Sequence, residues 1–331
     1  MSHNAASVDV KRAVHGEPLS VHGSRNTRVS SSSADGNHRI KESKMAGWLF
    51  VLPAIAVALV FVVAPFINTV RLSFTDATFS NPGEFVGLEQ YQKMLQDDAV
   101  HTGLLNSTLY VVCVVPCMVI LPLILATLVA GNSKILGFFR ASFYLPVVVS
   151  SVIVGLVWTN LLDVRGLVNS LLKAMGWIKD TIPFLTDRWL LLFSAMAITI
   201  WTGLGYYMII YLSALANIDE SLYEAAALDG AGVVRRFLHV TVPGCRSTMV
   251  LVMLLSSAAA FRVFNEIYVL TGGTGGVGGK DVTMTMLIKN YGTGLNAKYG
   301  YAGAISMLVF LIVGSLIAIE FFVQRKVDRD A

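Results

Sequence analysis

Six long apolar segments constrain this chain more than any other feature of its sequence. A helix needs about 20 predominantly apolar residues to cross the hydrocarbon core of a bilayer. Six such runs leave too little polar surface to cover them all in water. Only 14% of the residues are charged, whereas an ordinary soluble domain has about 25%. The segments that meet the length requirement are 48–70, 109–130, 143–162, 189–215, 249–270 and 301–323.

These segments predict an all-α membrane protein with six transmembrane helices and a polar loop between the fourth and the fifth. Several of them contain a proline, which lacks the backbone donor of an ordinary helical residue. Neighbouring groups in a membrane protein re-satisfy the carbonyl groups freed in this way, so proline does not argue against a span. The prolines are Pro53, Pro65, Pro116, Pro122 and Pro146.

The first 44 residues differ from the rest of the chain. They are rich in Ser, His, Asn and basic residues and lack a periodic apolar face, so they bury too little surface to fold alone. A signal peptide is not expected, because no apolar core lies near the start and no small-residue cleavage site follows 48–70. We expect a disordered cytoplasmic tail over 1–44 and one membrane domain over 45–331. Met45 stays open as an alternative start.

The distribution of Lys and Arg predicts the orientation of the chain, because short cytoplasmic loops carry an excess of both. With the N-terminus inside, the inner segments hold most of these residues, including Arg235, Arg236 and Arg325. Both termini are therefore expected in the cytoplasm, in a multi-pass protein of the plasma (inner) membrane. The net charge of +4 follows from this topology. The sequence contains no basic patch interleaved with aromatic residues, so nucleic-acid binding is not predicted.

Neither the cysteines nor a glycine-rich stretch predicts a metal or nucleotide site. Cys113 and Cys117 lie one turn apart in an apolar segment without zinc-type spacing, which favours packing. Gly272–Lys280 looks like a phosphate-binding loop, but Thr274 stands where that loop needs Gly, and Asp281 where it needs Ser or Thr. We expect a flexible outer loop there. The chain is expected to hold no cofactor or metal and to hydrolyse no nucleotide itself.

The loop over about 219–243 is polar and alanine-rich, and it faces the cytoplasm in the predicted topology. Ser221 followed by Glu224 fits a capping box, in which each side chain satisfies a backbone N–H at the other's position. A short helix is therefore predicted over about 222–228.

The end of that helix is predicted at Asp229-Gly230, since Gly readily adopts the left-handed conformation. A second short helix is predicted over about 233–239, stopping before Pro243. Both helices belong to a loop that has to leave and re-enter the membrane.

A partner protein is one interpretation of this loop. Ala225, Ala226 and Ala227 present little bulk, and Arg235 and Arg236 suit an acidic or phosphate-lined neighbour. A helix lying in a groove of another protein is a recurring mode of recognition. A capped surface helix without any partner explains the local pattern equally well.

The loop resembles the signature of the permease subunits of binding-protein-dependent ABC importers: Glu-Ala-Ala, three residues, Gly, nine residues, Ile, any residue, Leu-Pro. The matching residues are Glu224, Ala225, Ala226, Gly230, Val240, Val242 and Pro243. Val240 for Ile and Val242 for Leu are conservative departures. Asp219 and Ser247 stand where relatives often have Pro.

The resemblance implies that this loop is the coupling helix, docked in a groove of a cytoplasmic ATPase subunit. ATP and Mg would then be bound by that partner. The residues expected to couple the chain to the ATPase are Ser221, Glu224, Ala225, Ala226, Asp229, Gly230, Arg235, Arg236 and Pro243.

Other stretches are similar to the maltose-type carbohydrate permeases, in the same order and with the same spacing. They are Leu52-Pro53-Ala54, Leu72-Ser73-Phe74, Phe85-Val86-Gly87-Leu88, Phe139-Arg140, Leu145-Pro146, Tyr268 to Gly273 and Gly300-Tyr301-Ala302. This resemblance implies a transport subunit rather than an enzyme. It also implies four kinds of neighbour: a second homologous permease, two ATPase subunits, an extracellular or periplasmic sugar-binding protein and membrane lipid.

Polar residues in the apolar segments predict a substrate pathway. Arg262, Asn265 and Glu266 fall at i, i+3 and i+4, and so share one face of a continuous fifth helix. Ionisable groups at such depth usually face the protein interior or a water-filled cavity. An Arg262–Glu266 pair that only stabilises the bundle is the alternative. Tyr207 and Tyr211 align on a face of the fourth helix.

Trp158 and Asn160 lie near the outer end of the third segment. Aromatic faces and amides suit sugar rings, but aromatic residues near helix ends are also ordinary interfacial anchors, and for Trp158 we favour the anchor.

Two other functional classes stay open at this point. A secondary transporter or channel would need no ATPase, but such proteins often have internal repeats and broken helices at the midplane, and no repeat is visible. An ABC permease for a peptide or amino acid is the second alternative. The similarity of the first outer loop and of the end of helix five to sugar permeases argues against it.

Overall fold

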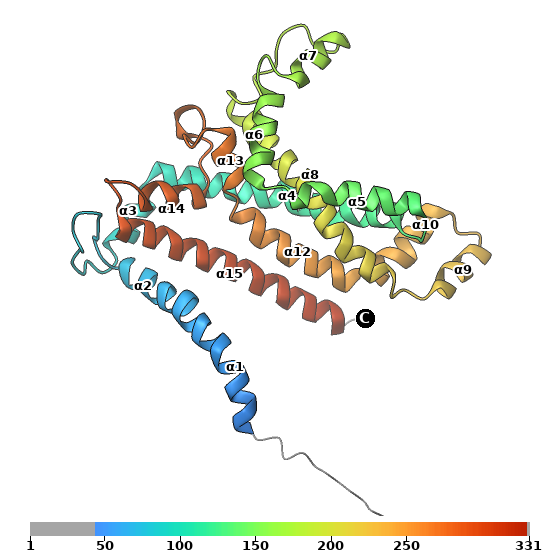
Figure 1. Cartoon of the computed structure of the whole chain (residues 1–331), viewed down its shortest axis with the longest axis horizontal. Coiled ribbons are helices and arrows are strands. Elements are labelled where there is room, and N and C mark those ends of the chain that lie inside the picture. The colour runs from blue at the N-terminus through green and yellow to red at the C-terminus, as the bar shows by residue number, and fades with distance from the viewer. Residues whose placement is uncertain (1–43, 330–331) are drawn as a thin grey trace, which may run out of the picture. The chain divides into compact units, whose positions relative to one another are not determined.

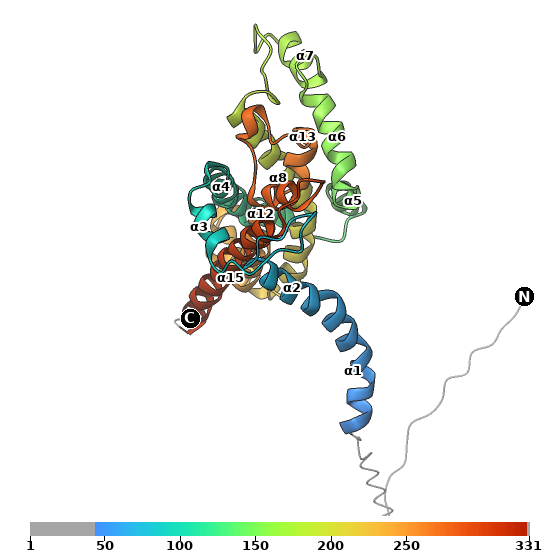
Figure 2. The ribbon, with the colours of Figure 1, turned by 90° about the vertical axis from the view of Figure 1, so that its left-hand side faces the viewer.

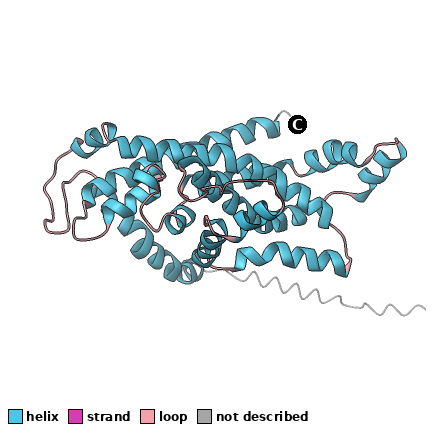
Figure 3. Cartoon of the chain, turned by 90° about the horizontal axis from the view of Figure 1, so that it is seen from above, coloured by secondary structure: helices cyan, strands magenta, loops and turns pink. Residues whose placement is uncertain are grey.

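The computed structural model describes residues 44–329, and they form α-helices connected by loops (Figures 1 and 3). Within that range, β-type pairing is limited to one isolated bridge between Thr75 and Phe85. Six helical segments are long and apolar enough to cross a membrane: Val51–Leu72, Asp98–Val129, Ser151–Ala174, Arg188–Leu215, Arg246–Leu270 and Tyr299–Phe322. The prediction of an all-α membrane protein with six spans is confirmed. The predicted tail, apart from Lys44, lies outside the described residues.

The chain divides into two compact units between Ile55 and Ala56. Most of α1 (Lys44–Ala58) belongs to the first unit. The helix passes through a π-helical turn (Leu59–Val63) into α2 (Ala64–Leu72). Pro65 lies in the first turn of α2. Its ring would clash with the carbonyl four residues earlier in a regular helix, and the wider π turn provides room there.

The core of the second unit is a bundle of four long helices (Figures 1 and 2). They are α4 (Asp98–Val129), α8 (Arg188–Leu215), α12 (Arg246–Phe261) and α15 (Tyr299–Arg329). Tyr110, Leu192 and Met208 are fully buried between them. Small residues let the backbones approach closely, as in other membrane bundles. A Cβ on Gly205 would overlap the backbone carbonyl of Phe143, so α8 packs directly on α5 (Lys134–Val148).

The third apolar segment is not one helix. α5 ends at Val148, and α6 (Ser151–Leu162) leaves the bundle in a different direction (Figures 1 and 2). Val149 and Ser150 have extended backbones, with ψ values of 139° and 131°. The predicted helix 143–162 is therefore wrong as a single element. A short helix, α7 (Leu167–Ala174), follows α6.

The fifth apolar segment is also broken. α12 ends at Phe261, residues 262–264 are non-helical, and α13 (Asn265–Leu270) begins after them. A broken membrane helix needs partners for its freed carbonyl groups. The Thr283 hydroxyl donates to the Val263 carbonyl at 2.9 Å and supplies one of them. The continuous helix predicted over 249–270 is therefore wrong.

One end of the bundle carries α3 (Glu89–Leu95) and α14 (Met284–Gly292); we call it the α14 end. Asp97 joins three helices there. Its carboxylate accepts from the Ala99 N–H of α4 at 2.8 Å, from Tyr291 at 3.2 Å and from Tyr301 at 2.6 Å. Partial burial opposes ionisation of Asp97, but these hydrogen bonds outweigh it and lower its pKa.

Candidate functional site

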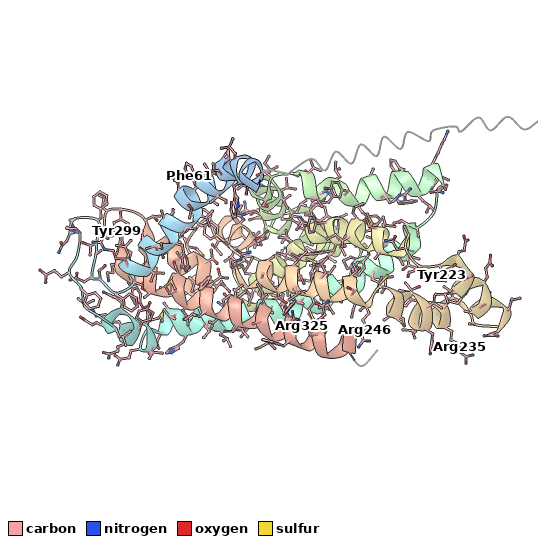
Figure 4. The ribbon with its side chains drawn as sticks, turned by 90° about the horizontal axis from the view of Figure 1, so that it is seen from below. Phe61, Tyr223, Arg235, Arg246, Tyr299 and Arg325 are labelled. Carbon is pink, nitrogen blue, oxygen red and sulfur yellow. The ribbon has the colours of Figure 1, made fainter. Side chains whose placement is uncertain are left out.

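The connection between α8 and α12 lies at the opposite end of the bundle, which we call the α9 end (Figures 1 and 4). It consists of α9 (Glu220–Leu228), α10 (Val233–Arg236), a π turn (Phe237–Thr241) and α11 (Val242–Gly244). All the residues predicted to couple the chain to an ATPase lie in this 219–243 loop or in its helices.

The N-terminus of α9 is capped by Asp219. Its side chain accepts from the Ser221 N–H at 3.0 Å, which also lowers the pKa of Asp219. Ser221 therefore lies inside the helix, and the predicted capping box between Ser221 and Glu224 is wrong. Asp is among the strongest N-cap residues, so the signal was present in the sequence. Glu224 is free of any capping role and is exposed.

The C-terminus of α9 is as predicted. Gly230 has φ +74°, in the left-handed region. The Gly230 N–H donates to the Ala227 carbonyl at 3.0 Å, and the Ala231 N–H donates to the Ala226 carbonyl at 2.9 Å. This pair of bonds is a Schellman motif. A Cβ on Gly230 would meet nothing within 4 Å, so glycine is favoured here by the backbone conformation alone.

The second half of the loop is helical beyond the predicted end. Pro243 lies inside α11, and the Cys245 N–H donates to the Thr241 carbonyl at 2.9 Å. The prediction that the helix stops before Pro243 is wrong, because a π turn precedes the proline and its ring sits in the first turn of α11. The Tyr223 and Thr241 hydroxyls, 3.0 Å apart, connect α9 to this turn.

The surface of the loop is more apolar than its sequence suggested. Leu228 is 90% exposed, although leucine is usually buried. The other large apolar side chains exposed here are Leu222, Val233, Val234 and Leu238. Ala225 is exposed beside them, Ala226 is half-buried, and Asp229 and Arg235 are exposed. In Figure 4, Arg235 points away from the bundle. Exposed apolar groups gathered in this way mark interaction surfaces.

A cavity of about 470 Å³ lies beneath this surface, between the end of α4 and the loop. Ile124, Leu128 and Tyr223 line it together with Val234 and Phe237, and the half-buried Arg236 is at its edge. The loop and the end of α4 therefore leave the space between them incompletely filled.

A second cavity, of about 240 Å³, lies where the broken helices meet α8. It brings together two of the predicted pathway residues, Tyr207 and Glu266. Its other polar groups were not predicted: Ser151, Thr199, Thr202, Tyr206 and Ser256. The sequence shows these only as isolated polar residues in apolar runs, and nothing in it places them together.

The remaining pathway residues do not line this cavity. Arg262 and Asn265 are exposed, and because the helix is broken, Arg262 shares no helical face with Asn265 or Glu266. In the described part of the chain, Arg262 forms no ion pair with Glu266; its Nε donates to the Ala258 carbonyl at 2.9 Å. The shared helical face and the stabilising Arg262–Glu266 pair are therefore both wrong, whereas a role of these residues in the substrate pathway stays a prediction.

Tyr211 is fully buried and donates to the Val119 carbonyl at 2.9 Å, so it joins α8 to α4 instead of facing the cavity. Trp158 is half-buried and packs edge-on against Trp201, with ring centroids 5.6 Å apart. Asn160 is exposed and donates to the Leu156 carbonyl of its own helix. Neither Trp158 nor Asn160 lines the cavity that holds Tyr207 and Glu266.

Residues 102–329 match the family described as "Binding-protein-dependent transport system inner membrane component". The chain is 35% identical over 293 residues to the probable ABC transporter permease protein YurN of Bacillus subtilis (strain 168), covering 87% of this chain and 99% of YurN. It is 34% identical over 286 residues to the lactose transport system permease protein LacF of Rhizobium radiobacter, covering 85% of this chain and 94% of LacF.

The fold is similar to that of a chain in the bacterial alginate ABC transporter in complex with an alginate pentasaccharide-bound periplasmic protein. The TM-score is 0.74 at 22% identity, over 86% of this chain and 95% of that chain.

Proposed function

Because this chain belongs to the family of inner-membrane components of binding-protein-dependent transport systems, we propose that it forms half of the translocation pathway of an ATP-driven sugar importer. The observation that carries the proposal is the 219–243 loop, in which the family signature, a Schellman-ended helix and an exposed apolar surface coincide. The similarity to LacF, a lactose permease protein, supports a sugar as the cargo.

The partners in this proposal are a second homologous permease, two ATPase subunits and an extracellular or periplasmic sugar-binding protein. The small side chains of Ala225 and Ala226 allow close approach of an ATPase groove, and Leu228 with Val233 supplies apolar area to bury in it. ATP and Mg are bound by the ATPase. The α9 end then faces the cytoplasm together with both termini, which agrees with the excess of Lys and Arg in the inner segments.

Transport proceeds by alternating access. ATP binding closes the two ATPase subunits, which carry the docked 219–243 loop with them, and the bundle changes from inward- to outward-facing. The binding protein delivers sugar, and hydrolysis resets the cycle. The ATPase drives this change only if it binds the two conformations with different affinity. Gly230 lies between α9 and α10 and serves as the hinge through which a displacement of α9 moves α10.

The cavity at the broken helices is where this chain lines the sugar's path. Tyr206 and Tyr207 pack edge-to-face, with ring centroids 5.1 Å apart. Glu266 of α13 and the hydroxyl groups of Thr199 and Thr202 line the same cavity. Aromatic rings next to several hydrogen-bonding groups suit a saccharide, which has apolar ring faces and many hydroxyls.

Replacing Glu266 with glutamine should lower sugar uptake in vesicles that contain the complete transporter. A hydrogen bond to a charged group is worth about 1.5–3 kcal/mol, so a fall of about 10-fold or more is expected at sugar concentrations below saturation. Glu84→Gln is the matched control, because Glu84 is exposed and lies outside the cavity. Equal uptake by both variants would place the sugar's path elsewhere.

Replacing Glu224 with lysine should remove the ATPase from the purified complex, since a reversed charge on the exposed face of α9 would then oppose docking. The measurement is purification of tagged chains in mild detergent, followed by mass spectrometry of what accompanies them. The wild type should bring an ATPase and a second permease, and the variant only the permease. Glu84→Lys, the same charge reversal at another exposed carboxylate, should keep the ATPase.

The same purification tests the alternative class. A wild-type chain that is isolated alone, and that still moves solute without ATP, would contradict the proposal and indicate a secondary transporter or channel. The comparisons favour neither that class nor a permease for another kind of solute.

A further inference from the structure

The loop that follows α13 contains an unusual buried group. Asp281 is 1% exposed, and neither of its carboxylate oxygens has a hydrogen-bond partner among the described residues. Burying a polar group without a partner costs free energy, and burying a charged one costs far more. A carboxyl group in this position is therefore much better tolerated in its neutral form.

The loop is built around this carboxyl group. Six of its glycines have positive φ: Gly272, Gly273, Gly275, Gly276, Gly278 and Gly279. A Cβ on Gly276 would overlap Oδ2 of Asp281. The Asp281 N–H donates to the Gly275 carbonyl at 2.8 Å. The aspartate thus fills the inside of a loop that sequence alone presents as a flexible glycine run.

Helix α4 holds the C-terminal end of the loop, and the start of α8 supplies the charges that act on Asp281. Asn106 of α4 is fully buried, and its Nδ2 donates to the carbonyls of Lys280 and Val282 at 2.8 Å each, on either side of Asp281. The charged groups that act on Asp281 come from the start of α8: Arg188 favours its ionised form, and Asp187 opposes it. Arg188 Nε is itself buried without a hydrogen-bond partner.

We propose that Asp281 is a proton-controlled latch on the 272–280 loop. With a neutral carboxyl group the loop keeps the conformation described here. When the carboxyl group ionises, it turns toward Arg188, the cation that favours its ionised form, and the loop is released from Asn106 of α4. Its placement on the external side rests on the proposed topology and function, so the latch would respond to the pH outside the cell.

The titration range follows from the surroundings of the carboxyl group. Burial raises the pKa of Asp281 to about 6 from the ordinary value of 3.8, although Arg188 pulls it down. An acid with a raised pKa favours the buried conformation fully below its ordinary pKa, and this advantage is lost as the pH rises through the raised value. The closed loop is therefore most favoured near pH 4 and is weakened above pH 6.

Hydrogen exchange of residues 272–283 in the complete transporter, in lipid nanodiscs, measures the latch without any need for sugar. After correction for intrinsic exchange, opening should increase between pH 4.5 and 7 by about 25-fold, as expected for a carboxyl group whose pKa is about 6 in the closed loop and 3.8 in the open one. Asp281→Asn, which is neutral at every pH, should show no step. Arg188→Gln should move the step to higher pH, because the cation that favours ionisation is removed.

Two glycine variants provide a matched pair. Gly276→Ala and Gly278→Ala both place a side chain at positive φ, +77° and +67°, but only the first meets Asp281. Gly276→Ala should displace the carboxyl group and abolish the pH step, whereas Gly278→Ala should keep it. A wild type without a step, a step that persists in Asp281→Asn, or equal loss of it in both alanine variants would overturn the latch.

Failure of the latch and failure of the transporter assignment are distinguishable. The exchange experiment reads only the loop, and the purification of Glu224→Lys reads only the ATPase partner. A flat exchange profile in a chain that still brings its ATPase would refute the latch alone. A pH-dependent step in hydrogen exchange, in a chain that does not co-purify with an ATPase, would support the latch but would show that it has no role in ATP-driven import.

Discussion

Replacing Leu228 with aspartate is expected to reduce binding of the ATPase to this permease by about 100-fold or more. Burial of a leucine side chain is worth about 1.5–3 kcal/mol, and an unpaired carboxylate in the same place adds a desolvation cost of similar size or larger. Because Leu228 is 90% exposed in the isolated chain, the substitution removes little packing from the permease itself. The effect should therefore appear in association and not in folding.

The measurement is a titration of purified ATPase subunits against wild-type and variant permease in nanodiscs. Leu95→Asp is the matched control. Leu95 is 72% exposed on α3, at the α14 end of the bundle. Normal ATPase binding by Leu228→Asp would show that the exposed apolar surface of the 219–243 loop is not the docking surface.

Replacing Gly230 with valine should uncouple ATP hydrolysis from transport. Gly230 has φ +74°, and for a residue with a Cβ the left-handed region costs roughly 1–2 kcal/mol, with β-branched residues among the worst. The Schellman motif would rearrange, and α9 would no longer pass its movement on to α10. Uptake should fall at least about 10-fold, the factor that corresponds to 1.4 kcal/mol, while the ATPase continues to turn over.

Two controls separate backbone conformation from side-chain bulk at this position. Gly230→Asn should retain coupling, because asparagine tolerates the left-handed region better than other residues with a side chain. Gly232→Ala should also retain it, since Gly232 has φ −68° and open space around it. Measuring sugar uptake and ATP hydrolysis in the same vesicles would give the number of sugar molecules transported per ATP hydrolysed, which is the coupling ratio. Retained coupling in Gly230→Val would refute the hinge.

Local signals in the sequence predict the structure where they depend on one residue and its immediate neighbours. Gly230 was predicted as a left-handed helix end, and the structure has the complete Schellman motif there. The other end of the same helix was predicted wrongly. Asp219 and Ser221 are both good N-cap residues, and the choice between them depends on where the chain leaves α8.

The candidate cargo site was only partly predictable. Tyr207 and Glu266 were named from the sequence and do line one cavity, whereas Arg262, Asn265 and Tyr211 do not. The prediction assumed a straight helix through Arg262 and Glu266. The break over 262–264 turns these side chains apart, and the carbonyl group it frees is satisfied by Thr283, a residue of a different element.

The sequence by itself determined the class of the protein and the position of the 219–243 loop with its family signature. The length of an apolar segment decides whether it can cross a bilayer. The family signature consists of a few residue types at short, defined spacings, so it can be recognised without the tertiary structure. The tertiary structure decided where the third and fifth spans break, which polar groups share a cavity, and that Leu228 is exposed while Asp281 is buried. Those features depend on hydrogen bonds and packing between residues far apart in the chain, such as Asn106 with Lys280 and Val282.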